Sequence, residues 1–259
     1  MKAESQPRFH YPGLDACPPK SADDVRLRRD LMKLLSTKLT VECLEDRTVP
    51  ATLVSPHVLT YQDIDGDNVT VTFSLPVLSS NNVNDVFHFN VGNVNGSDSQ
   101  RQQLQDINIS IIPREVVDGT DITVAAVQSQ EGDGRANIGS ISVYERTLGN
   151  VSIGGDLGRI TASLILDDGP TVLQRLFANS IGKFGLSTQE PGGSLTSLLV
   201  RNVGTIETAG DIVGARILLA SPDSSPSLDS LIIHGSLRGT GDAQSGQIDI
   251  RCRKRLGGM

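Results

Sequence analysis

The strings Ile138-Gly-Ser-Ile-Ser-Val143 and Leu148-Gly-Asn-Val-Ser-Ile153 follow one pattern of six residues, which we call the hexad. An apolar residue and a glycine are followed by apolar residues at alternate positions, and this period of two is typical of a β-strand with one buried face. The hexad returns with looser last positions at 157–162, 181–186 and 203–208, and similar alternation without the glycine occurs at 195–200 and 228–233. The region from 138 to 250 is therefore predicted to be a repeat of short strands.

The spacing of the glycines predicts how these strands are arranged. Gly139, Gly149 and Gly158 are separated by 10 and 9 residues, and Gly182, Gly204 and Gly214 follow at 24, 22 and 10. Such spacings favour a parallel β-solenoid with one strand per face and two or three faces per coil. We expect the glycines to supply positive φ at the corners, and the coils to stack at about 4.8 Å around an aliphatic column.

Residues 52–134 have a different pattern, which predicts a small antiparallel sheet or β-sandwich. The string Val69-Thr-Val-Thr-Phe73 alternates, and more alternation follows at 86–91, 107–112 and 122–127. Asp65-Gly66 suits a tight hairpin, and turns are expected at Asn95-Gly96 and Asp118-Gly119.

The composition excludes several classes of protein. A formal net charge of −7, a pI near 5.1 and 3% aromatic residues with no Trp argue against binding of nucleic acid, which needs a basic surface and stacking side chains. Cys17, Cys43 and Cys252 have neither metal-ligand nor disulfide-framework spacing. No apolar run reaches the roughly 18 residues of a membrane-spanning helix.

Both ends of the chain differ from the β-rich body. Residues 1–51 are predicted to be a disordered segment containing a short helix, since residues 27, 31, 34 and 35 form an apolar stripe on a basic background. Residues 251–259 are an irregular basic tail without a polar capping coil. A solenoid without such a cap presents an open β edge that invites association, so we expect a truncated or frameshifted member of a longer family, with Met32 as an alternative start.

The segment Val41-Glu-Cys-Leu-Glu-Asp-Arg-Thr-Val-Pro-Ala51 resembles the VExLEDRxVPA segment of large secreted or cell-surface repeat proteins of planctomycete-type bacteria. The glycine-rich strings at 151–162, 191–197 and 235–239 resemble the C-terminal β-solenoid repeats of the same family, and 52–130 has no counterpart in the resemblance. The resemblance implies export, and therefore a secreted or cell-surface location.

Asp63, Asp65 and Asp67 are the candidate metal ligands. Their alternation is similar to the first ligand positions of a calcium loop, but the sixth and twelfth positions of an EF-hand are here Asn68 and Ser74. The favoured interpretation is an Asp-rich hairpin turn, and the alternative is a calcium site of low affinity.

The remaining polar residues support no catalytic site. Paired carboxylates on β-helices are typical of glycosidases and polysaccharide lyases, but the four aspartates near the solenoid read better as corner residues. The histidines share no metal-binding spacing. The three serines lack the strand-turn-helix GxSxG context of a nucleophile. These residues are Asp156, Asp167, Asp168 and Asp211, then His10, His57, His88 and His234, and finally Ser180, Ser187 and Ser194.

The sequence thus predicts an all-β protein with an antiparallel β-sandwich at 52–134 followed by a parallel β-solenoid at 135–250. We expect a non-catalytic structural or adhesin-like function and no cofactor apart from calcium. The alternative is a carbohydrate-active β-helix protein. The expected partners are extracellular matrix, polysaccharide or a surface protein, with edge-to-edge self-association as a further option.

Overall fold

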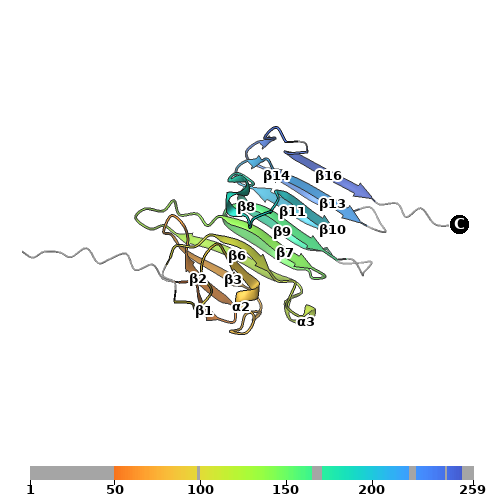
Figure 1. Ribbon diagram of the computed structural model, residues 1–259. Helices are drawn as coiled ribbons and strands as arrows, with labels where there is room; N and C mark the ends of the chain where they lie inside the picture. Colours follow the sequence, from red (N-terminus) through yellow and green to blue (C-terminus); the bar gives the residue numbers. More distant parts are fainter. Residues whose placement is uncertain (1–49, 98–99, 165–170, 222–225, 243, 253–259) are drawn as a thin grey trace, which may run out of the picture. The chain divides into compact units, whose positions relative to one another are not determined.

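The computed structural model describes residues 50–97, 100–164, 171–221, 226–242 and 244–252. All but the last two residues of the predicted export segment, 1–51, lie outside the described residues. The predicted irregular tail, 251–259, is wrong for residues 251 and 252, which belong to the last strand, and its other residues are not described. The described chain is all-β, as predicted, and its strands join in one mixed, curled sheet (Figure 1). Among the described residues, no helix has the length and apolar character needed to cross a membrane.

The strands and short helices follow one another along the chain with brief connections. Strands β1 to β6 span Thr52–Ser55, Val58–Gln62, Asn68–Phe73, Phe87–Phe89, Leu104–Asn108 and Thr120–Val127. Strands β7 to β12 span Ile138–Tyr144, Leu148–Ser163, Leu173–Ile181, Thr196–Val200, Val203–Thr208 and Ile212–Val213. Strands β13 to β16 span Arg216–Ser221, Leu228–Ile233, Leu237–Arg238 and Gln247–Cys252, and the helical turns are α2 (Val83–Val86), α3 (Arg114–Val117) and η1 (Gly185–Thr188).

The first part of the sheet is antiparallel. Strands β1, β2, β3 and β6 are neighbours in that order, and the predicted β2–β3 hairpin is confirmed. Val69, Val71 and Phe73 of β3 are buried, and the threonines between them are only partly buried, as the alternation predicts. The hairpin loop spans 63–67, and Gly66 within it has φ +97°, which glycine adopts without strain.

A second antiparallel pair lies against this hairpin. Strand β4 pairs with β5, and its two phenylalanines contact the hairpin through edge-to-face ring pairs. The ring centroids of Phe89 and Tyr61 are 5.0 Å apart, and those of Phe87 and Phe73 are 6.1 Å apart. These contacts place much of the small aromatic content of the chain in one region of the core.

From β5 onward the strands form two long parallel ladders, together with a short one that joins the end of β9 to β12 and β15. The first ladder contains β5, β7, the second half of β8, β10, β13 and β16. The second contains β6, the first half of β8, β9, β11 and β14. Because β6 pairs with β8, the hydrogen-bonded sheet crosses the predicted domain boundary at 134/135.

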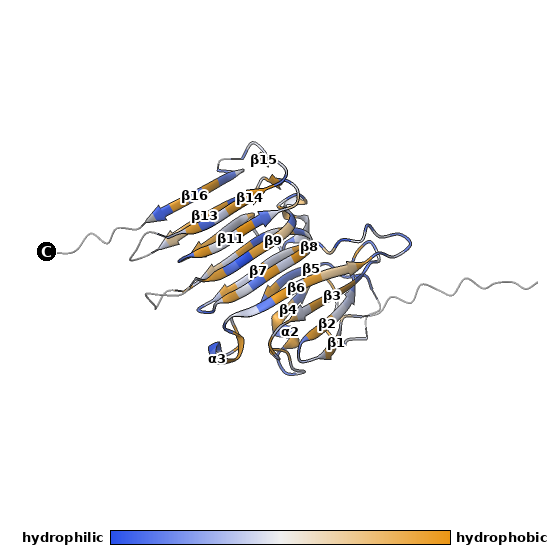
Figure 2. Ribbon diagram, turned by 180° about the vertical axis from the view of Figure 1, so that it is seen from behind, coloured by the Kyte–Doolittle hydropathy of each residue, from blue (hydrophilic) through white to orange (hydrophobic). Residues whose placement is uncertain are grey.

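Aliphatic side chains align across the strands of both ladders. Figure 2 shows apolar and polar residues alternating along these strands, as expected for strands with one buried face. The aligned side chains are almost fully buried, so each strand extends a continuous apolar row. The rows include Ile107, Ile141 and Ile160 in the first ladder, and Ile122, Val151, Leu176 and Ile206 in the second.

We expected the regularly spaced glycines to adopt positive φ at corners, and this expectation is wrong for four of the six. Positive φ occurs at Gly182 (+74°) and Gly214 (+65°), but Gly139, Gly149, Gly158 and Gly204 lie inside strands without it. A Cβ at Gly204 would come much closer than 3.0 Å to the Gln174 carbonyl oxygen of the neighbouring strand. Glycine is therefore needed here because another segment approaches closely, and a turn conformation is not the reason.

The last strands of both ladders are the most exposed. Leu231 of β14 is 37% exposed and Ile250 of β16 is 57% exposed, whereas the aligned residues Ile206 and Leu219 are fully buried. Within the described residues, β14 pairs only with β11, and β16 pairs only with β13. Each of these strands therefore presents one free edge.

Candidate functional site

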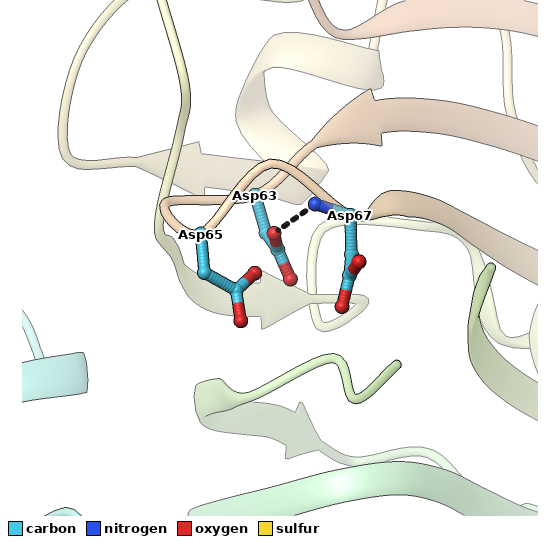
Figure 3. A group of neighbouring side chains, drawn as sticks. All are labelled: Asp63, Asp65 and Asp67. Carbon is cyan, nitrogen blue, oxygen red and sulfur yellow. Dashed lines mark hydrogen bonds between the residues drawn. The ribbon is translucent and has the colours of Figure 1, made fainter. Parts of the chain in front are cut away.

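The three predicted metal ligands lie together in the loop between β2 and β3. Asp63, Asp65 and Asp67 each offer a carboxylate oxygen, and these oxygens lie within 4.8 Å of one another. Figure 3 shows the three side chains pointing to the same side of the loop. Asp63 and Asp67 are buried, so this acidic loop is not an ordinary solvated turn.

Backbone N–H groups from a second loop bind this cluster. The Asp67 carboxylate accepts hydrogen bonds from the backbone N–H groups of Ser129 (2.6 Å) and Gly134 (2.5 Å), and Asp65 accepts one from Asp133 (3.3 Å). Asp63 accepts one from the backbone N–H of Asp67 at 2.8 Å. The segment 129–134, which follows β6, is therefore held against the hairpin loop by carboxylates.

The proximity of the carboxylates changes their proton affinity. Burial, aided by the hydrogen bond and negative charge of Asp65, raises the pKa of Asp63 to about 8. A hydrogen bond from the Asp63 carboxyl lowers the pKa of Asp65 below its ordinary value. Asp63 therefore binds its proton more tightly than an ordinary aspartate, because its charged form is buried and lies beside a second negative charge.

Two buried oxygens beside the loop have no hydrogen-bond partner among the residues that the structure describes. They are Gln62 Oε1 and the hydroxyl of Tyr61. Burial and the charge of Asp63 raise the pKa of Tyr61, which places its phenol within electrostatic reach of the cluster. Arg101 lies against Gly66 and forms a 2.8 Å ion pair with Glu131, so a cation is present at the rim.

Two of the four aspartates near the predicted solenoid bind backbone N–H groups of connections, Asp156 from within β8 and Asp211 from just before β12. Asp156 accepts hydrogen bonds from the Ser180 hydroxyl (2.7 Å) and the backbone N–H of Lys183 (3.1 Å). Asp211 accepts one from the backbone N–H of Ser236 at 2.7 Å. These carboxylates hold the backbone of the neighbouring connections, and Asp167 and Asp168 lie outside the described residues.

The serines and histidines that the sequence analysis considered also make hydrogen bonds or polar contacts with nearby groups. Ser187 donates to the Phe184 carbonyl (2.7 Å), and the Ser194 hydroxyl accepts from the backbone N–H of Thr196 (3.2 Å). His57 Nδ1 lies 3.1 Å from the Phe73 carbonyl oxygen. His234 Nε2 lies 3.3 Å from Glu207, and His10 is outside the described residues.

One group of titratable side chains was not anticipated from the sequence. His88, Asp106 and Ser140 are aligned on the adjacent strands β4, β5 and β7. His88 Nδ1 lies 2.9 Å from Glu190 Oε1, and the Asp106 carboxylate accepts from the hydroxyls of Ser140 (2.5 Å) and Ser142 (3.0 Å). Burial raises the pKa of Asp106 in spite of these two hydrogen bonds.

This group could not be found from spacing. His88 alternates with Phe87 and Phe89, which places its side chain on the opposite face of β4, but only the strand order brings Asp106 beside it. Glu190 comes from a connection 102 residues further along the chain than His88.

Comparison with known proteins adds no relative from which a function can be inferred. No family model matches the chain, and neither a curated protein nor a solved structure does.

Proposed function

We propose that this protein is a non-catalytic structural or adhesin-like component of secreted or cell-surface material. In this proposal, residues 135–250 form a parallel β-solenoid and residues 52–134 form a small β-sandwich in front of it. The observation that supports this most is the repeated return of the chain to the same parallel ladders, two long and one short. Successive strands that return to the same ladders build a long, regular body, which suits a scaffold.

The polar residues of the ladders support a structural role as well. The carboxylates of Asp156 and Asp211 accept hydrogen bonds from backbone N–H groups of connections. Ser197 is buried, and its hydroxyl oxygen accepts a hydrogen bond from the Ile160 N–H at 3.0 Å. Groups that are committed to holding the backbone in this way are poorly placed to act on a substrate.

Export is proposed on the resemblance of the 41–51 segment to that of planctomycete-type secreted repeat proteins. The measurement is fractionation of a planctomycete-type host that produces the chain. We expect the chain at the cell surface or in the medium, and we expect retention inside the cell when Glu45, Asp46 and Arg47 are changed to alanine. Equal export of both forms contradicts a role of this segment in export.

The proposed partners are extracellular polysaccharide, matrix or another surface protein. A net charge of −7 disfavours anionic polymers such as nucleic acid. The free edges of β14 and β16, with exposed apolar side chains beside them, also suit association of one copy with another.

A carbohydrate-active function is the second candidate, and one observation favours it. His88, Glu190 and the buried Asp106 bring a base, an exposed carboxylate and a carboxyl of raised pKa into one neighbourhood. A carboxyl of raised pKa near a second carboxyl group is the pairing used for general acid and base catalysis of glycoside cleavage.

A polysaccharide panel separates the two functions. The structural proposal expects binding to insoluble polysaccharide or to matrix without soluble products. Reproducible cleavage that is lost in Glu190→Gln, and retained in the control Glu115→Gln, refutes it and establishes the alternative. Glu115 is a suitable control because it is an exposed glutamate on α3, on another part of the surface.

A further inference from the structure

The acidic loop brings three carboxyl groups together, and the cation at its rim, Arg101, is shared with Glu131. Asp67 is fully buried, Asp63 is 6% exposed, and Asp65 lies beside them with a carboxylate oxygen within 4.8 Å of theirs. Removing charges from water is costly unless each is paired with an opposite charge. The hydrogen bonds from backbone N–H groups offset part of this cost, but they bring no positive charge.

A second observation is independent of the carboxylates. Gln62 is 7% exposed, and its side-chain Nε2 donates to the Gly66 carbonyl at 3.0 Å, so its amide lies against the same loop. The Oε1 of this amide has no hydrogen-bond partner within the described part of the chain. Orphaned buried oxygens are rare because each costs about 1–3 kcal/mol, and a bound ion is one accepted reason for them.

We propose that Asp63, Asp65 and Asp67, together with the amide oxygen of Gln62, bind a divalent cation of the calcium type. All donors are oxygens, which suits a hard cation, and the absence of His and Cys from this described cluster disfavours zinc. Calcium accepts about six to eight oxygens at about 2.3–2.6 Å in irregular geometry. Backbone carbonyls and water complete the coordination.

The cation has a structural consequence because the cluster joins two segments. The carboxylates of Asp65 and Asp67 already bind the backbone of 129–134, which leads from β6 toward β7. An ion bound to the same carboxylates fixes the β2–β3 loop and this connection together. The site therefore stabilises the connection between the antiparallel strands and the parallel ladders, and it does not depend on the proposed function.

Thermal unfolding of the full chain tests the proposal. Calcium chloride at about ten times the dissociation constant is expected to raise the midpoint on the order of 3–5 °C over the same chain in EDTA. Magnesium should give a smaller rise, because it demands more regular geometry. The rise should vanish in Asp63→Asn and Asp65→Asn, and it should persist in Asp85→Asn, a change of an exposed aspartate on α2.

Asp63→Asn is the most informative variant because the asparagine Oδ1 still accepts from the Asp67 N–H, so the fold is retained while a charged ligand is lost. An equal rise with calcium in this variant overturns the proposal. So does the absence of any rise in the unaltered chain.

Terbium luminescence provides a readout that does not depend on stability. Terbium replaces calcium in oxygen sites and emits when a nearby tyrosine is excited, and Tyr61 lies two residues before Asp63 in a chain without Trp. We expect sensitised emission that calcium displaces. Tyr61→Phe should abolish the emission while the calcium-dependent rise in midpoint remains. Emission that persists in Asp65→Asn shows that terbium binds elsewhere and refutes the site.

Discussion

Replacing Gly204 by alanine tests the close stacking of β11 on β9. A Cβ at this position would approach the Gln174 carbonyl oxygen much more closely than 3.0 Å, and the obstacle is backbone that cannot rotate away. The strands must separate locally, which weakens one or two ladder hydrogen bonds of about 0.5–1.5 kcal/mol each and adds about 1–3 kcal/mol of packing strain. Restriction of the unfolded chain by alanine returns about 0.4–1 kcal/mol. We therefore expect a net loss of about 2–3 kcal/mol in the free energy of unfolding.

Urea unfolding followed by far-ultraviolet circular dichroism measures this loss, and the midpoint of thermal unfolding should fall by roughly 4–12 °C. Gly154→Ala is the matched control, because Gly154 also lies in a strand without positive φ and its added Cβ would be 3.1 Å from the Val124 carbonyl oxygen. We expect this control to cost less than about 1 kcal/mol. Equal losses in the two variants would refute the argument from close approach.

Three further changes test other features of the fold. Ser197→Ala leaves the buried Ile160 N–H without an acceptor and should cost about 1–3 kcal/mol, with faster hydrogen exchange at Ile160; unchanged exchange speaks against this bond. Because burial raises the folded-state pKa of Asp106 above its unfolded value, the contribution of this group to stability is greatest at low pH, and it is lost as pH rises from about 4 through the raised pKa. Urea unfolding at several pH values in this range should show this contribution to the free energy of unfolding decreasing as pH rises. The same pH dependence in Asp106→Asn contradicts the assignment of this effect to Asp106. Leu157→Ala should cost about 2–5 kcal/mol and the exposed Leu237→Ala less than about 1 kcal/mol, so similar thermal midpoints for the two exclude a core at Leu157.

The all-β class could be predicted because alternation is a local property of the sequence. The β2–β3 hairpin is equally local, since two alternating strings flank an Asp- and Gly-rich loop. The role of Gly204 could not be predicted, because it depends on a neighbouring strand about 30 residues earlier in the chain. A glycine required by a neighbour and a glycine required by a turn look the same in the sequence.

The difference between contacts that are local in sequence and contacts from distant strands also separates the two groups of titratable residues. Asp63, Asp65 and Asp67 are near each other in sequence, so their proximity was predictable, although their burial was not. The burial depends on the segment 129–134, which is brought by the pairing of β6 with β3. His88 and Glu190 are near each other only because of the strand order and the connection after η1, and no motif marks either residue.

The sequence separation along the second ladder has a consequence for how the protein folds and unfolds. Leu148 pairs with Leu173, Leu173 with Val203 and Val203 with Leu228. Paired positions on neighbouring strands are therefore only 25 to 30 residues apart in the sequence. Each new strand closes a loop of about the same length, so its cost in loop-closure entropy is about the same as for the strand before it. The strand already in place acts as the template for the next one. Growth is then sequential, and opening starts at the exposed β14. Protection against hydrogen exchange should accordingly decrease in steps from β9 to β14, one strand at a time.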